Sequence, residues 1–135
     1  MKRIAIPIVA LLLFCACGGN SDPSSSSQSP TLTGTWSFNG TSQSFGYNYS
    51  GTATLQQNGS SVTGQTTLSG SPCATQASIS GTMSGNTVNL QLDENGDTVN
   101  LTGTVNSSFT SISGTYTSSP GCTNGDQGTW SATKQ

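Results

Sequence analysis

Few residues in this chain could act as catalytic acids, bases or activated nucleophiles, and their scarcity argues against most types of catalysis. The 135-residue sequence has no histidine, and Lys134 is the only lysine or arginine after Arg3. Serine and threonine hydroxyls are plentiful, but a nucleophilic hydroxyl needs a neighbouring base, which the sequence does not supply. The glycines fall in alternating segments with no following helix, so there is no phosphate loop or dinucleotide fingerprint. We therefore expect a protein that is not an enzyme and that uses no cofactor.

A lipidation site is the most specific chemical signal in the sequence. Two basic residues precede the apolar run 4–14, which is too short to span a bilayer and is typical of a signal peptide. The segment FCACGG that follows resembles a bacterial lipobox, in which a small residue precedes a cysteine that receives a diacylglyceryl group. Ala16 is small and Phe14 is bulky, so the resemblance implies that Cys17, and not Cys15, carries the lipid.

The resemblance to bacterial lipoproteins also implies a membrane anchor and a location. Residues 1–16 would be the signal peptide, and the mature chain would begin at the acylated Cys17. Acyl chains such as palmitate anchor stably when several are present, since each buried methylene adds about 0.8 kcal/mol. In this family an aspartate after the lipidated cysteine is associated with the inner membrane, so Gly18 favours the outer membrane of the cell envelope. The alternative is an ordinary secretory signal cleaved near Ala16.

The composition after the signal indicates a tether followed by one domain. Residues 17–31 are rich in serine and contain proline, which predicts a flexible tether, and residues 32–135 are predicted to form the folded domain. Only 6% of the residues are charged and the net charge is −2, so no basic surface is available for nucleic acid. The expected partners are a membrane, through the lipid, and a small hydrophobic ligand.

The hydrophobic pattern of the domain has a period of two. Apolar residues alternate with Thr, Ser, Asn and Gln in about eight segments, which predicts strands with one buried and one wet face. Such strands in an antiparallel up-and-down meander most simply close into an eight-stranded barrel without edges. We therefore predict an all-β barrel, with a two-layer β-sandwich as the alternative.

The connections between these strands alternate in length, so the two ends of the barrel should differ. We name the closed end after its expected short turns, at 58–60, 84–86 and 106–108. We name the open end after its expected longer links, at 40–44, 69–75, 93–97 and 118–127. Cys73 and Cys122 both lie in links of the open end and suit a disulfide, because two cysteines without histidine make a poor zinc site. In the chain-entropy model this disulfide would contribute roughly 4 kcal/mol.

The acidic residues also gather at the open end. Asp93, Glu94 and Asp97 lie in LDENGD, and Asp126 lies in NGDQ. Carboxylates can bind Ca²⁺, but the spacing does not match an EF-hand loop. We therefore expect solubilising charges around turns and no metal site.

Glycines and aromatic residues occupy positions where the pattern calls for inward side chains. Gly34, Gly64, Gly81 and Gly103 are expected near the closed end, with Gly114 nearer the middle, where missing side chains would let the strands coil. Aromatic side chains with polar tips suit a small-ligand site. The candidate ligand-binding residues, expected around the open end, are Trp36, Phe38, Tyr47, Tyr49, Tyr116 and Trp130.

Two short segments resemble the calycin group, which includes lipocalins and avidins. They are LTGTW at 32–36 and GTW at 128–130. The resemblance implies an up-and-down barrel. Asn39 and Ser42 lie where avidins contact biotin, but the rest of the avidin pattern is missing, so biotin binding is not carried over. The sequence thus favours a lipid-anchored barrel that binds a small apolar or amphiphilic ligand. The alternative is a non-catalytic structural or interaction module with a solid core.

Overall fold

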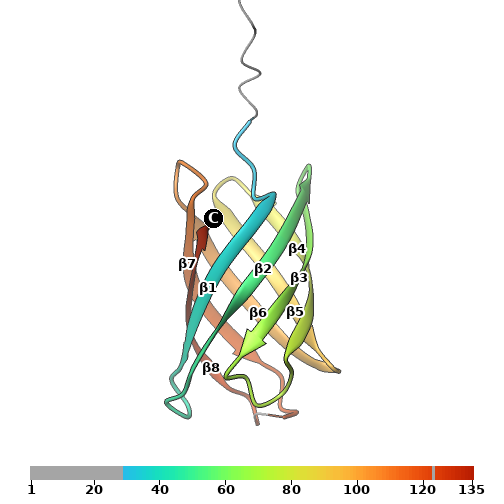
Figure 1. Ribbon diagram of the computed structural model, residues 1–135, viewed down its shortest axis with the longest axis vertical. Coiled ribbons are helices and arrows are strands. Elements are labelled where there is room, and N and C mark those ends of the chain that lie inside the picture. The colour runs from blue at the N-terminus through green and yellow to red at the C-terminus, as the bar shows by residue number, and fades with distance from the viewer. Residues whose placement is uncertain (1–28, 123) are drawn as a thin grey trace, which may run out of the picture.

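The protein is a closed barrel of eight antiparallel strands in up-and-down order (Figure 1). The computed structural model describes residues 29–122 and 124–135, so the signal peptide, Cys15, Cys17 and most of the tether lie outside the described residues. The prediction of an all-β barrel is confirmed, and the sandwich alternative is wrong. The strands are β1 (Gly34–Ser42), β2 (Asn48–Asn58), β3 (Ser61–Ser69), β4 (Gln76–Ser84), β5 (Thr87–Glu94), β6 (Asp97–Val105), β7 (Ser111–Ser118) and β8 (Gln127–Lys134).

The barrel closes because β1 pairs with strands on both of its sides. Its residues face β2 in a register that includes Phe38 opposite Gly51, and they face β8 in a register that includes Phe38 opposite Ala132. Every strand therefore has two neighbours, and no edge is left open to pair with another chain. Among the described residues, no helix is long and apolar enough to cross a membrane.

The alternating pattern divides each strand into an inner and an outer row. In β5, for example, Val88, Leu90 and Leu92 are buried, whereas the residues between them are exposed. The outer row consists mainly of the polar residues Thr, Ser, Asn and Gln. The apolar residues of the inner rows pack together into a single core. Burial of this core supplies the main driving force for folding.

The apolar side chains at the closed end are almost completely buried. Leu32, Val62 and Val88 are each 0% exposed, and Val105 is 1% exposed. The chain enters the barrel at this end beside the C-terminus, as Figure 1 shows. Leu32 is positioned there by its backbone carbonyl, which accepts a hydrogen bond of 2.8 Å from Trp36 Nε1.

The position of Trp36 differs from the prediction, which placed this residue in the open half of the barrel. It is the third residue of β1, which starts at the closed end. The Lys134 ammonium lies 5.7 Å from the centre of its ring and donates to the Thr31 carbonyl. The error arose because neighbouring strands in a tilted, staggered barrel do not start at one level.

Two connections also differ from expectation. The link at 93–97 was predicted to be long, but β5 and β6 are joined by the two-residue turn Asn95–Gly96. Their φ angles of 57° and 99° fit an Asn-Gly hairpin turn, and Asp93 Oδ1 accepts from the Gly96 amide. The connection after β6 was predicted to be a short turn at 106–108, but it runs from 106 to 110. Asn106 Oδ1 organises it by accepting from the amides of Thr110 and Ser111.

The inward glycines lie where adjacent strands approach too closely for a side chain. A Cβ at Gly64, Gly81 or Gly114 would collide with a backbone carbonyl of the neighbouring strand. At Gly103 a Cβ would lie 2.8 Å from the Trp130 ring and 2.9 Å from Ile112 Cγ2. The glycines therefore permit the sharp coiling of a small barrel.

Candidate functional site

A cavity of about 80 Å³ lies inside the barrel and extends toward the open end. Its mouth is bordered by residues of the open-end links, including Ser71, Pro72 and Asp126, whereas none of the closed-end turns contributes to its wall. The wall includes all six aromatic residues that the sequence nominated: Trp36, Phe38, Tyr47, Tyr49, Tyr116 and Trp130. Trp36 lies at the deep end of the cavity, beside the closed end.

Trp130 occupies the middle of the barrel because two facing glycines leave room for it. Gly103 and Gly114 pair across β6 and β7, so no side chain projects inward there. The Trp130 indole extends across this gap, and its Nε1 donates to the carbonyls of Thr102 at 3.3 Å and Thr115 at 3.2 Å. The glycine pair thus exposes backbone acceptors that hold the indole in place.

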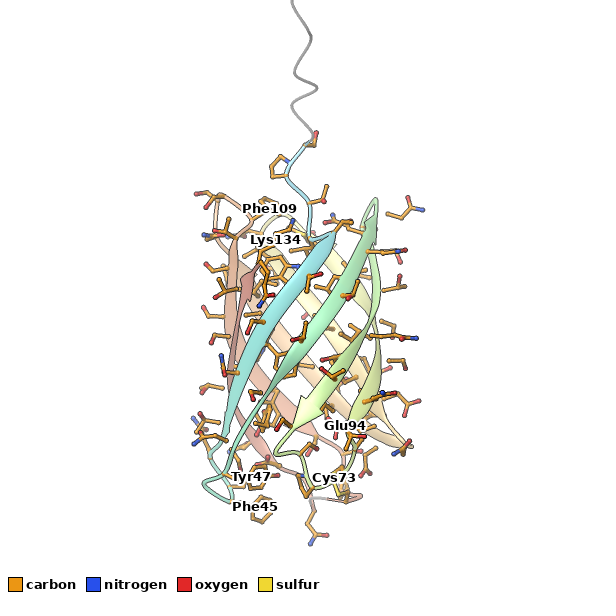
Figure 2. All side chains as sticks on the ribbon, in the orientation of Figure 1. Phe45, Tyr47, Cys73, Glu94, Phe109 and Lys134 are labelled. Atoms are coloured by element: carbon orange, nitrogen blue, oxygen red, sulfur yellow. A yellow bond between two sulfur atoms is a disulfide. The ribbon has the colours of Figure 1, made fainter. Side chains whose placement is uncertain are left out.

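Four aromatic rings form a continuous row at the mouth, from the β1–β2 link to β7. Phe45 stacks on Tyr47 with ring centres 6.1 Å apart, and Tyr47 lies 6.4 Å from Tyr49. Tyr49 meets Tyr116 edge-on at 5.5 Å. Phe45 is the exposed end of this row, with 56% of its surface accessible, and Figure 2 places it at the rim beside Tyr47.

Asp126 is the hydrogen-bonding centre of the mouth, although the sequence suggested a solubilising charge. It is only 3% exposed. Ser42 Oγ donates to one carboxylate oxygen at 2.8 Å, and the hydroxyls of Tyr116 and Tyr47 donate to the other at 2.7 and 3.2 Å. These bonds join β1, the β1–β2 link, β7 and the β7–β8 link at a single carboxylate.

The surroundings of Asp126 change the pKa values of the groups that meet there. Burial acts to raise the pKa of Asp126, but hydrogen bonds from Tyr116, Ser42 and Tyr47 outweigh it and lower the pKa below its ordinary value. Burial, followed by the nearby Asp126 carboxylate, raises the pKa of Tyr47 to about 12, and burial with the Asp126 hydrogen bond raises that of Tyr116 to about 12. At neutral pH the site therefore holds an ionised aspartate and neutral tyrosines.

Glu94 is a second buried carboxylate at the mouth, 8% exposed, and it also contradicts the prediction of a solubilising turn charge. It continues the inward row of β5 after Leu92, so its side chain lines the cavity. One of its oxygens, Oε2, accepts from Ser71 Oγ at 3.1 Å. Burial raises the pKa of Glu94; the Ser71 hydrogen bond opposes this shift and the negative charge of Asp97 adds to it.

The cysteine pair connects two links at the mouth, and Cys73 also lines the cavity. Cys73 and Cys122 have disulfide geometry, with Cα atoms 5.6 Å apart and a sequence separation of 49. The pair joins the β3–β4 link to the β7–β8 link, as the sequence predicted. Asp97 Oδ2 also accepts a 2.6 Å hydrogen bond from the Cys122 amide, so β6 is tied to the same bridge.

Sequence reasoning found the aromatic wall and missed its polar partners. Ser42 points inward and is 2% exposed, whereas Asn39 is exposed on the outer face. The signal for Glu94 was present, because Leu90, Leu92 and Glu94 share one parity. No comparable signal existed for Asp126, which lies in an irregular link.

The fold and cavity define a class, a closed up-and-down β-barrel with an internal site that extends to one end. No protein-family model matches the chain, and no curated protein shows significant sequence similarity to it. The residues of the cavity are therefore the basis for any inference about function.

Proposed function

We propose that this protein is a lipid-anchored lipoprotein of the bacterial envelope whose barrel binds a small apolar or amphiphilic ligand at its open end. The observation that carries the binding proposal is the cavity, with its mainly apolar wall and aromatic mouth. Ligand sites in proteins typically combine such a wall with a few placed polar groups, which here are Glu94, Asp126 and the tyrosine hydroxyls.

The contrast between the two ends supports binding over a purely structural role. Protein interiors are normally packed to the density of organic crystals, and at the closed end of this barrel four apolar side chains are 0–1% exposed: Leu32, Val62, Val88 and Val105. Unfilled space beside buried side chains lowers stability, so a core built only for stability would be filled throughout. The cavity of about 80 Å³ has room for a group of a few heavy atoms and not for a large ligand.

Native mass spectrometry of the protein purified from its own host tests this proposal. We expect a small molecule to be retained with the barrel and to be released on denaturation. The matched variant is Ala132→Leu, which adds bulk to the cavity wall and should reduce retention while the barrel remains folded by circular dichroism. An empty parent protein that also fails to bind small amphiphiles would favour the alternative, a structural or interaction module of the envelope.

A further inference from the structure

We infer that the open end selects ligands that carry a small organic ammonium group, held by the Glu94 carboxylate among the tyrosines of the mouth. This inference rests on the proposed ligand-binding function and specifies the chemistry of the ligand. It starts from the charge of Glu94, which has no positively charged partner among the residues that the structure describes.

The Glu94 side chain is more than nine-tenths buried and faces the cavity. Ser71 donates to Oε2, and no described residue donates a hydrogen bond to Oε1. A buried carboxylate is costly unless a cation or several donors compensate it. Because no fully buried side-chain oxygen of the described residues lacks a hydrogen-bond partner, Oε1 is accessible, and a ligand ammonium would supply both a charge and N–H donors there.

Asp126 differs from Glu94, because hydroxyl groups of the protein itself donate to both of its carboxylate oxygens. Asp126 therefore positions Tyr47 and Tyr116, and Glu94 remains the acceptor for a ligand. Aromatic rings attract organic cations through their faces, most strongly where water is excluded, so the tyrosine row suits the alkyl groups around an ammonium nitrogen.

The charge distribution of the whole barrel agrees with this assignment. Asp93, Glu94, Asp97 and Asp126 are all the acidic residues that the structure describes, and all four belong to the open end. Lys134, the only lysine or arginine in the same part of the chain, lies at the opposite end, where Figure 2 shows it far from Glu94. A one-signed mouth with apolar walls attracts cations and repels anions.

Three probes of equal length separate charge from apolarity: n-butylammonium, 1-butanol and butyrate. Each is titrated into the purified full-length protein while the indole N–H signals of Trp36 and Trp130 are followed by NMR. We expect n-butylammonium to bind about tenfold more tightly than 1-butanol, as a charge-assisted hydrogen bond requires, and butyrate to bind most weakly. Glu94→Gln should remove the preference for n-butylammonium over 1-butanol.

Asp93→Asn is the matched control for Glu94→Gln. It removes the same charge from the adjacent residue of β5, but Asp93 is exposed on the outer face. We expect its affinity for n-butylammonium to change by less than about threefold, since exposed charges act weakly through water. Equal binding of n-butylammonium and 1-butanol, or equal loss in both variants, would overturn the ammonium inference and leave the proposed function standing. Binding of none of the three probes would contradict both.

Discussion

At the scale of single residues, Glu94 and Asp126 show two ways to bury a carboxylate. Asp126 receives three hydroxyl donors, which stabilise its charge and lower its pKa. Glu94 receives one, and its burial raises its pKa. Asp126 therefore contributes to folding as an anion, whereas an ionised Glu94 opposes folding. A residue that lowers stability in this way is commonly retained for function.

The first prediction concerns the pH dependence that follows from Glu94. Its folded-state pKa lies above the ordinary glutamate value, so the parent loses stability as the pH rises from that value through the raised pKa. The neutral glutamine in Glu94→Gln lacks this loss and can still accept from Ser71. We expect the urea midpoint of the variant to exceed that of the parent at pH 7–8, with the difference shrinking toward pH 4. The charged or titratable groups that influence Glu94 are Asp97 and Tyr47, and both remain in the variant. A variant less stable than the parent at pH 8 would contradict this account.

The second prediction concerns Asp126. Asp126→Asn weakens the charge-assisted bonds from Ser42, Tyr116 and Tyr47, so we expect a loss of about 1.5–3 kcal/mol in unfolding free energy at pH 7. Because the folded pKa of Asp126 is lowered, this stabilisation is present above the ordinary aspartate pKa and disappears as the pH falls through the folded value. Urea denaturation at several pH values measures it. The exposed Asp93→Asn serves as the control, with a change within about 0.5 kcal/mol.

At the scale of elements, the strands combine strict alternation with inward glycines at points of close approach. Gly81 lies opposite Val62 on β3 and Leu90 on β5, and its missing side chain lets the three strands coil together. The Gly103–Gly114 pair extends the same device and adds a place for Trp130. Coiling and the placement of a large aromatic side chain thus depend on the same small residues.

The third prediction separates strand propensity from packing at these glycines. Valine is the better strand former, but Gly81→Val would meet the Asn89 carbonyl and Gly103→Val would meet the Trp130 ring. We expect each variant to lose about 1–3 kcal/mol, as overpacking typically does. Thr82→Val on the outer face should be nearly neutral or slightly stabilising. If both glycine variants had higher urea midpoints than the parent, the close approach of the strands would be wrong.

The fourth prediction concerns the brace between two open-end links. Protein recovered from the envelope should show one disulfide in the domain, between Cys73 and Cys122, when intact mass is compared with and without reduction after alkylation. Replacing both cysteines with serine should lower the unfolding free energy by up to roughly 4 kcal/mol, because the unfolded chain is then less restricted. Alkylation of both thiols without reductant would exclude the bond.

The period-two pattern was sufficient to predict the strands, their up-and-down order and the inner aromatic row. It could not predict the level of each residue along the barrel, because tilt and stagger depend on pairings between strands, and Trp36 was misplaced for this reason. It also could not predict that Asp126 turns inward, since the direction of a link residue depends on tertiary contacts with Ser42 and Tyr116. Polar groups of the site that lie in links were thus beyond sequence reasoning, whereas Glu94, on a strand, was within its reach.

At the scale of the whole molecule, the two ends of the barrel differ in the side chains that they hold. The closed end holds the filled core, both ends of the described chain and the Lys134 charge (Figures 1 and 2). The open end holds the cavity, the carboxylates and the cysteine pair. If the open end binds a ligand as proposed, this division would let the mouth change while the closed end keeps the barrel folded.

The fifth prediction tests the proposed anchor in the full-length chain. Cys17→Ser should abolish membrane association, since no thiol remains at the predicted lipidation position, and Cys15→Ser should leave it intact. Detergent partitioning and intact mass measure the attached acyl groups. Acyl mass on the Cys17→Ser protein would show that the lipobox was assigned to the wrong cysteine.

Because the chain enters the barrel at the closed end, a lipid anchor on Cys17 would also affect which way the mouth of the cavity can face. With a lipid on Cys17, the tether reaches the barrel at the end opposite the cavity, and residues 18–31 span at most on the order of 50 Å when extended. If the barrel stands with its closed end toward the bilayer, the mouth faces the surrounding aqueous phase. In that orientation the barrel would exchange its ligand with the aqueous phase or with a soluble carrier. The membrane would anchor the protein and would not supply the ligand.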